Sequence, residues 1–233
     1  MDGASKPVDW KAVHDQLDEQ GFARLPGLLS PRECEEIRRL YPNDEGFRSR
    51  IVMEKHNFGR GEYKYFSYPL PGLVASLRKN LYPELAVGAN RWNEQLGKHE
   101  RFPTKHAEFI EQCHAAGQKR PTPLVLRYGA DDYNCLHQDL YGSMYFPLQV
   151  AILLSEPERD FEGGEFVLVE QRPRMQSRVE VIFLKQGDAV VFAVNQRPRL
   201  GKRGYFRTTM RHGVSTVRSG ERLTLGVIFH DAK

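Results

Sequence analysis

The stretch PTPLVLRY, residues 121–128, decides the fold because the character of the chain changes there. From this point to the C-terminus, short apolar and β-branched runs follow one another, separated by Gly, Asp and Asn. Such runs, with no helical pattern between them, indicate an antiparallel sandwich or barrel of the jelly-roll kind. We expect strands over residues 124–128, 134–137, 148–154, 165–169, 179–184, 189–194, 205–212 and 223–229. The Arg-rich connection 195–205 is predicted to be a surface loop or a flexible hairpin.

The residues before this stretch have a mostly helical pattern. Ser30, Pro31 and Glu33 are typical of a helix start with an N-cap, a proline at the first position and a capping box. Apolar periodicity predicts helices over 10–20, 30–40, 73–96 and 105–116, and short strands at 22–25 and 47–53. The segment 56–68 is a Gly-punctuated loop or hairpin rich in aromatic and basic residues. The sequence thus predicts an α+β fold, with a helical region 1–120, including a lid at about 47–69, packed on a β core 121–233 as one folding unit.

Composition excludes several classes of protein. With 233 residues, 40% hydrophobic and 27% charged, the chain is typical of a globular domain rather than of a collagen-like, coiled-coil or disordered protein. The longest apolar run, 146–154, is too short for a membrane span and contains Pro147 and Gln149. The N-terminal MDGASKPVDW lacks the apolar region of a secretory signal. The three cysteines form no CxxC pair, so a reducing cytoplasm is the expected location.

Positive charge is concentrated in one region. The chain carries a net charge of +4, but residues 171–222 hold 12 basic and three acidic residues, a local net of +9. A solvated basic surface would explain this asymmetry. A face that attracts a polyanion or an anionic substrate would explain it equally well.

A candidate metal site begins with His137 and Asp139 on the second predicted strand of the β core. Residues i and i+2 of a strand point to the same side, so an imidazole and a carboxylate are offered together. His212, near the end of the seventh predicted strand, supplies a second imidazole. Two histidines and one carboxylate on one face, with open positions left, form the facial triad of non-haem Fe(II) oxygenases.

Arg222 opens the last predicted strand, ten residues after His212. Its guanidinium is suited to grip the far carboxylate of an anionic iron chelator in a bidentate pair. A structural metal in a non-catalytic binding module is the alternative from a different class. Structural zinc prefers four protein ligands, and the spare candidates, His230 and Cys135, are better explained as a capping or core residue and a small buried hydrophobe.

One motif acts as a decoy. His106 and Glu108 have the same spacing as His137 and Asp139, but they lie in a predicted helix, where residues i and i+2 do not face each other. We interpret them as part of a solvated helical face.

In this pattern the sequence resembles the Fe(II)/2-oxoglutarate-dependent dioxygenases over most of its length. The matching features follow in the family's order: HQD at 137–139, DFEGGEF at 160–166, QGDAVVF at 186–192, His212 and then Arg222. QGFARLPGLLSPRE at 20–33 is similar to the stretch that precedes many such cores. The resemblance implies a double-stranded β-helix core.

Two subgroups share features with the chain. Tyr128, nine residues before His137, matches the cosubstrate-binding tyrosine of AlkB-type nucleic-acid demethylases, although Leu126 stands where that group has asparagine. A single arginine at 222 is closer to the prolyl-hydroxylase arrangement. The whole chain looks most similar to a bacterial group of oxygenases that is grouped by prediction with nucleic-acid-modifying enzymes.

The resemblance also implies roles for individual residues. His137, Asp139 and His212 would bind Fe(II), and 2-oxoglutarate would chelate the metal while its distal carboxylate pairs with Arg222 and with Tyr128 or Thr224. With O2, the enzyme would hydroxylate a C–H bond or oxidatively remove an N-methyl group, releasing succinate and CO2. Ascorbate is expected to support activity.

The substrate is left open between three classes, with nucleic acid slightly favoured over a protein side chain and a small molecule third. Nucleic acid is favoured by the interleaved basic and aromatic residues of the 197–207 segment and by the aromatic lid. Against this, the lid alternates as an ordinary half-buried strand would, and an arginine-rich loop would suit an acidic protein. The candidate substrate-contacting residues are Arg197, Arg199, Lys202, Arg203, Arg211 and Tyr65.

Overall fold

The computed structural model describes residues 8–233. Part of the N-terminal segment used to predict the absence of a secretory signal, residues 1–7, lies outside the described residues. The helices are α1 (Trp10–Gln20), α2 (Pro31–Leu40), the 3-10 helix η1 (Met53–His56), α3 (Gly72–Gln95) and α4 (His106–Ala115). The N-terminal strands are β1 (Phe22–Leu25), β2 (Phe47–Val52), β3 (Gly59–Arg60) and β4 (Glu62–Phe66). The remaining strands are β5 (Leu124–Tyr128), β6 (Tyr133–His137), β7 (Leu148–Leu153), β8 (Phe161–Gly163), β9 (Phe166–Gln171), β10 (Arg178–Ile182), β11 (Ala189–Ala193), β12 (Gln196–Gly201), β13 (Gly204–Val214), β14 (Val217–Gly220) and β15 (Arg222–Val227).

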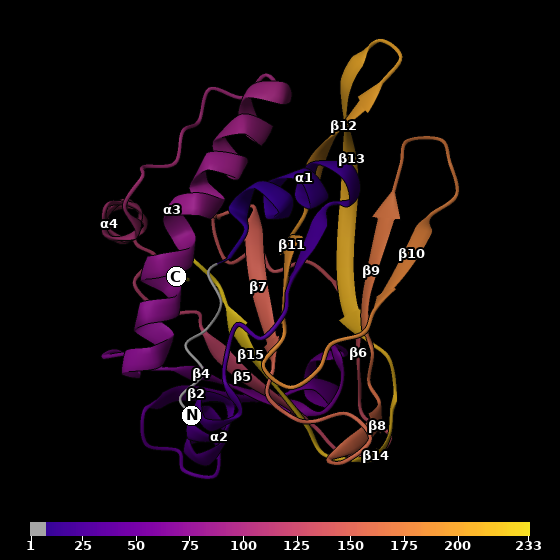
Figure 1. The fold of residues 1–233 in the computed structure, drawn as a ribbon. Helices are drawn as coiled ribbons and strands as arrows, with labels where there is room; N and C mark the ends of the chain where they lie inside the picture. The colour runs from indigo at the N-terminus through magenta and orange to yellow at the C-terminus, as the bar shows by residue number, and fades with distance from the viewer. Residues whose placement is uncertain (1–7) are drawn as a thin grey trace.

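Two antiparallel sheets form the core (Figure 1). The larger has seven strands in the order β1-β11-β7-β15-β5-β4-β2, and the smaller has the order β10-β9-β13-β6-β3 with β12 pairing on β13. A short β14-β8 pair lies at one end. Many neighbouring strands are far apart in sequence, such as β11 and β1 or β15 and β5, as in a jelly roll.

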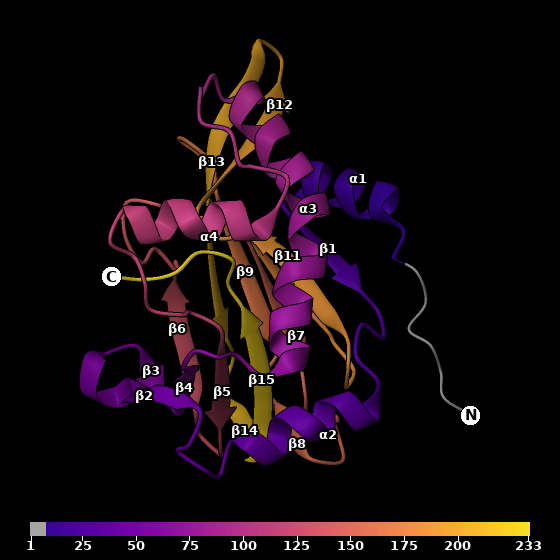
Figure 2. The same cartoon turned by 90° about the vertical axis from the view of Figure 1, so that its left-hand side faces the viewer.

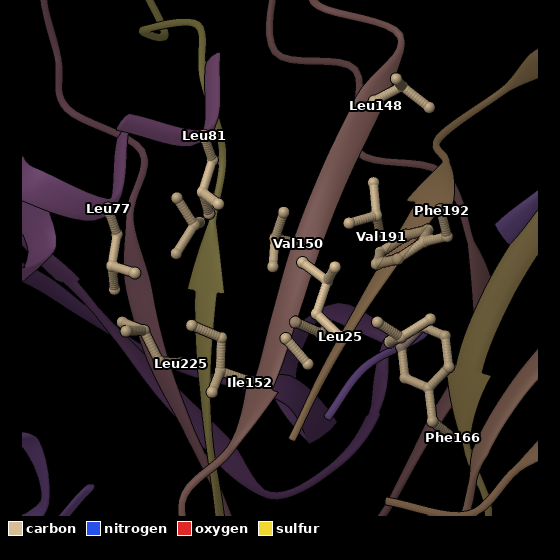
Figure 3. Close-up of a cluster of buried hydrophobic side chains, with 14 of the residues drawn as sticks. Leu25, Leu77, Leu81, Leu148, Val150, Ile152, Phe166, Val191, Phe192 and Leu225 are labelled. Atoms are coloured by element: carbon tan, nitrogen blue, oxygen red, sulfur yellow. The ribbon is translucent and has the colours of Figure 1, made fainter. Parts of the chain in front are cut away.

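The central strands of the larger sheet, β7, β11 and β15, are buried on both faces. Figure 3 shows Leu77 and Leu81 of α3 directed toward Val150 and Ile152 of β7 and toward Leu225 of β15. On the neighbouring strand β11, Phe192 points to the other side of the sheet. All residues of β7, β11 and β15 are therefore buried, and these strands have continuous apolar runs instead of alternation.

The N-terminal region is part of the sheets as well as a helical layer. β1 pairs with β11, β4 pairs with β5, and β3 pairs with β6. Figure 2 shows α3 and α4 in front of the sheets, with β4 beside β5 and β3 beside β6. The lid predicted at 47–69 is thus built into both sheets, so the two predicted segments share one core.

The helices follow the sequence prediction closely. Ser30 and Glu33 form the predicted capping box of α2, with both reciprocal hydrogen bonds present. Among the described residues, no helix is long and apolar enough to cross a membrane.

Candidate functional site

Three potential metal ligands meet between β6 and β13. His212 of β13 lies opposite His137 at the end of β6, and Asp139 follows two residues later. Nε2 of His137 lies 3.6 Å from Oδ1 of Asp139, and Nε2 of His212 lies 3.3 Å from Oδ2. One ligand atom from each residue falls within 4.8 Å of the others, an arrangement that could hold a metal ion.

The electrostatics of this group favour metal binding. Burial opposes ionisation of Asp139, but the hydrogen bond and charge of His212, followed by the charge of His137, hold the pKa of its carboxyl well below the usual range. Burial, followed by the neighbouring His137, lowers the pKa of His212. At neutral pH the site therefore offers a carboxylate and a neutral imidazole, the forms that bind metals.

Neighbouring residues fix the orientation of these ligands. The hydroxyl of Tyr141 donates to Oδ1 of Asp139 at 2.6 Å. Nδ1 of His137 lies 2.8 Å from the carbonyl oxygen of Cys135, and a donor at this nitrogen leaves Nε2 as the acceptor for a metal. The side chain of Gln138 donates to Asn195 and to the carbonyl of Met210, which ties the loop after β6 to β13.

A second polar group lies at the Arg222 end of the same cavity. Arg222 is 2% exposed, and among the described residues no carboxylate forms an ion pair with it and its Nε has no hydrogen-bond partner. Burial lowers its pKa to about 10, so the guanidinium still carries its charge at neutral pH. A buried, uncompensated cation is costly, and a carboxylate ligand would remove that cost.

Tyr128 and Thr224 complete this group. Tyr128 lies opposite Arg222 in the β5–β15 ladder, and Nη1 of Arg222 donates to the hydroxyl of Thr224 at 2.6 Å. The Tyr128 hydroxyl accepts a hydrogen bond from Asn134, so its own proton remains for a ligand. Burial raises the pKa of Tyr128, which keeps that proton in place at neutral pH.

Glycine at position 164 makes room for Arg222. Gly164 has a φ of +61°, and a Cβ there would lie 2.8 Å from Cδ of Arg222. The second glycine of the DFEGGEF motif is therefore required here, because any side chain at position 164 would displace the side chain of Arg222.

One cavity joins the two groups. Its volume is about 180 Å³, and both the metal triad and Tyr128, Arg222 and Thr224 line it. Most of the remaining wall is apolar or aromatic, including Phe58, Tyr63, Phe166 and Phe192. A small anion and an apolar or aromatic group would both find complementary surfaces here.

The predicted substrate residues occupy different environments. Lys202 and Arg203 lie exposed between β12 and β13, and Arg211 is exposed on β13. Arg199 is partly buried and donates to Glu170 at 2.9 Å. None of these four side chains lines the cavity.

Two of the predicted substrate residues are packed inside the protein instead. Arg197 is 1% exposed, pairs with Glu170 at 2.7 Å and donates to backbone carbonyls of α1, because β12 turns this position inward. Its guanidinium is thus occupied by structural contacts. Tyr65 is buried against Tyr63 and Tyr141, with Arg48 over its ring, and it is Tyr63 that reaches the cavity.

His230, Cys135 and His106 lie outside the proposed metal site. His230 is a core residue as predicted, with Nδ1 accepting from the backbone of Phe146. Cys135 was wrongly expected to be buried: it is exposed, since only the two-residue β3 covers the outer edge of β6. His106 was wrongly placed on a solvated face, because its Nε2 contacts the carbonyl of Phe229 and burial lowers its pKa to about 4.

Sequence reasoning missed several cavity residues. Tyr141 lies two positions after Asp139, and Asn134 lies three before His137, so their closeness to the HQD motif was the signal for both. Gln149 gave a signal, as a polar residue inside the most apolar run of the chain. Phe58 belonged to the predicted lid but was not singled out.

The fold is shared with solved oxygenase structures. Similar structures include a prolyl-4-hydroxylase of Pseudomonas putida, with a TM-score of 0.56 and 13% identity over 96% of this chain and 99% of that one. A 2OG-Fe(II) oxygenase family oxidoreductase of Burkholderia pseudomallei has a TM-score of 0.54 and 19% identity, covering 98% and 95%. A prolyl hydroxylase of Trichoplax adhaerens, solved with a hypoxia-inducible factor peptide fragment, has a TM-score of 0.55 and 17% identity, covering 96% and 94%. The fold is therefore the oxygenase jelly roll.

Sequence comparison also assigns the chain to a protein family. The model of a family described as "Oxygenase, catalysing oxidative methylation of damaged DNA" matches residues 61–232. Two uncharacterized proteins from strains of Mycobacterium tuberculosis are each 50% identical over 167 residues, which cover 72% of this chain and 72% of theirs.

Fold, site and family together define an oxygenase, an oxidoreductase with the fold of the 2OG-Fe(II) oxygenases and a cluster of three residues that could hold a metal ion. The chain belongs to the oxygenase family whose model it matches. This confirms the fold class and the oxygenase class predicted from the HQD, His212 and Arg222 pattern.

Proposed function

We propose that His137, Asp139 and His212 bind Fe(II) and that Arg222, Tyr128 and Thr224 bind the distal carboxylate of 2-oxoglutarate. The unpartnered Nε of buried Arg222 supports the second assignment, and the 4.8 Å cluster of ligand atoms supports the first. Bound Fe(II) with 2-oxoglutarate and O2 would supply the oxidation of a C–H bond. The protein's own groups orient the ligands, anchor the cosubstrate and enclose the reacting bond in an apolar cavity.

We further propose that the oxidised group belongs to a base of single-stranded or locally opened nucleic acid, with hydroxylation or removal of an N-methyl group as the outcome. The description of the matching family supports this substrate class. The observation that carries it is the outer face of β13. Alternation along this strand directs Tyr205, Arg207 and Arg211 to solvent while His212 points inward.

This outer face continues across the smaller sheet without acidic residues. Register places Val169 beside Arg211 and Val179 beside Val169. The outward positions of the three strands are Val167, Val169, Gln171, Val179, Val181, Tyr205, Arg207, Thr209 and Arg211. Arginines among apolar and aromatic side chains are typical of surfaces that hold phosphates and stack bases. Arg207 and Arg211 are four residues apart, about 13 Å along a strand.

The test compares nucleic-acid and protein substrates directly. Protein supplied with Fe(II), 2-oxoglutarate and ascorbate is incubated with methylated single-stranded oligonucleotides, and formaldehyde, succinate and mass shifts are measured. His212→Ala serves as the inactive control, since it removes one proposed ligand. Oligonucleotide-dependent turnover supports the proposal. Its absence, together with hydroxylation of proteins in an extract, would favour a protein side-chain hydroxylase instead.

Salt dependence tests the proposed binding face. The double variant Arg207→Glu/Arg211→Glu should lower the slope of log Kd against log salt by about 1.4, because each phosphate contact on a single strand contributes about 0.7. The control is Lys11→Glu/Arg39→Glu, which changes the charge equally on exposed positions of α1 and α2. An equal effect of both double variants would contradict a specific face.

A further inference from the structure

Gln149 is a buried polar residue that neither the metal site nor the cosubstrate site uses. It lies on β7, lines the cavity and is only 5% exposed. Its Oε1 has no hydrogen-bond partner among the described residues. An unpaired buried amide is costly, so its presence in a fully buried strand whose other residues are all aliphatic requires an explanation.

The strand ladders place Gln149 far from Arg222 along the larger sheet. Thr224 lies opposite Leu153, and Gly226 lies opposite Ala151. Gln149 is the next residue of β7 on the same face, two positions beyond Ala151 and farther from Arg222. If the register is continued past the end of β7, the residue opposite Arg222 lies six positions from Gln149, about 20 Å along the strand direction. That span exceeds the length of a five-carbon diacid anchored on Arg222.

Gln149 is nevertheless close to the proposed iron ligands. It lies opposite Phe192 in the β7–β11 ladder, so the two side chains share a face. The ring of Phe192 is 4.6 Å from that of His212, measured between centroids. Gln149 therefore borders the part of the cavity in which a substrate group would meet the metal.

The chemistry of this region fits a planar ring with polar atoms on its edge. Phe192, Tyr63 and Phe58 supply flat apolar surfaces to the cavity. A glutamine amide offers one donor group and one acceptor, and such an amide pairs with adjacent acceptor and donor atoms on a base edge. An apolar methylene group, by contrast, would leave the amide unpaired.

We propose that Gln149 is a specificity-determining residue, whose amide hydrogen-bonds the edge of the substrate base inside the cavity and selects a base carrying an exocyclic amino group beside a ring acceptor. This inference rests on the proposed function, because it assigns a base as the occupant. It adds the residue that reads the base and the type of base edge that is read.

The experiment separates this inference from the proposed function. Single-stranded oligonucleotides carry either one adenine methylated on a ring nitrogen or the same ring-methylated purine without its exocyclic amino group, and kcat/KM is measured for both. The wild-type protein should prefer the amino-bearing base by about tenfold, the size expected for one base-edge contact. Gln149→Leu should remove this preference, while its Kd for 2-oxoglutarate, measured by calorimetry on metal-loaded protein, should stay within twofold of wild type.

Two further variants make the result decisive. Gln112→Leu, on the exposed face of α4, is the matched control and should keep the preference. Gln149→Asn retains an amide but withdraws it by one methylene, so it should lose the preference even in a case where the leucine variant folds poorly. A preference that survives in both Gln149 variants overturns the inference and leaves the proposed function standing. A matching loss of 2-oxoglutarate affinity would instead assign the amide to the cosubstrate, and a wild-type protein that turns over no oligonucleotide would overturn both proposals.

Discussion

At the scale of single residues, the cavity contains charges and polar atoms that the fold alone does not need. Arg222 is the strongest case, because its guanidinium is buried beside Tyr128 and Thr224 without a carboxylate partner among the described residues. Such a residue should affect ligand binding far more than stability. It therefore gives the sharpest test of the cosubstrate site.

Replacing Arg222 with Lys should weaken 2-oxoglutarate binding by about tenfold or more, since an ammonium cannot form the bidentate pair of a guanidinium. Calorimetric titration of metal-loaded protein with 2-oxoglutarate measures the effect. Arg127→Lys is the matched control, because Arg127 lies beside Tyr128 on β5 but points outward to Glu62 and Glu221. Unchanged affinity in the Arg222 variant would exclude this residue from the cosubstrate site.

Tyr141 should affect the metal rather than the cosubstrate. Tyr141→Phe removes the hydroxyl that donates to Oδ1 of Asp139, so the carboxylate loses the contact that orients it. We expect metal affinity to fall by about 10- to 100-fold, the usual effect of losing a hydrogen bond to a metal ligand. Competition with a metal-sensitive dye measures it. Tyr145→Phe, a partly buried tyrosine outside the cavity lining, should bind metal like the wild type.

At the scale of elements, the β12–β13 hairpin depends on one buried carboxylate. Glu170 of β9 receives hydrogen bonds from Arg172, Arg197 and Arg199, and the side chains of Glu170 and Arg197 are 8% and 1% exposed. The hairpin that projects at the top of Figure 1 is thus anchored at its base by a network that includes α1.

Glu170→Gln should therefore destabilise the protein by about 3–5 kcal/mol, because it leaves the buried Arg197 without a counter-charge. Urea unfolding followed by circular dichroism gives the free energy of unfolding. Glu180→Gln breaks the solvent-accessible pair with Arg178 and should cost no more than about 1 kcal/mol. Similar losses in both variants would show that Glu170 is not the anchor.

The elements also show how far the sequence could predict this structure. The apolar pattern predicted α1 and β5 at their observed bounds. α1 has apolar residues on one side and β5 has a continuous apolar run, so both patterns can be recognised without knowing which elements they pack against. The apolar pattern missed β8 and β14, which are short and polar and exist through pairing with a strand distant in sequence. β12 forms one arm of the hairpin that was one of the two alternatives predicted for 195–205. The site shows the same division: the local HQD motif predicted His137 and Asp139, and the order of features along the chain predicted His212. The inward turn of Arg197 depends on Glu170 and α1, which lie far away in the sequence.

At the scale of the whole molecule, the partly buried His106 and the buried His230 link the helical layer and the C-terminal segment to the core. Nε2 of His106 in α4 contacts the carbonyl of Phe229, and His230 accepts from the backbone of Phe146 through Nδ1. Burial lowers the pKa of His106 to about 4 and that of His230 to about 4. Both side chains are therefore neutral in the folded protein at pH 7 and down to about pH 5.

These two histidines should make stability fall as the pH is lowered from 7 to 5. An unfolded histidine titrates near pH 6.5, so across this range the unfolded chain binds protons that the folded protein does not, and the free energy of unfolding decreases with falling pH. Each histidine should contribute about 2 kcal/mol to that decrease. Urea unfolding of chelator-treated protein at pH 7 and pH 5 measures it without the added effect of metal. His230→Gln should reduce the decrease by about 2 kcal/mol, whereas His99→Gln, at an exposed position, should leave it as in the wild type. An identical pH dependence in wild type and the His230 variant would mean that this histidine, despite its burial, does not couple protonation to unfolding.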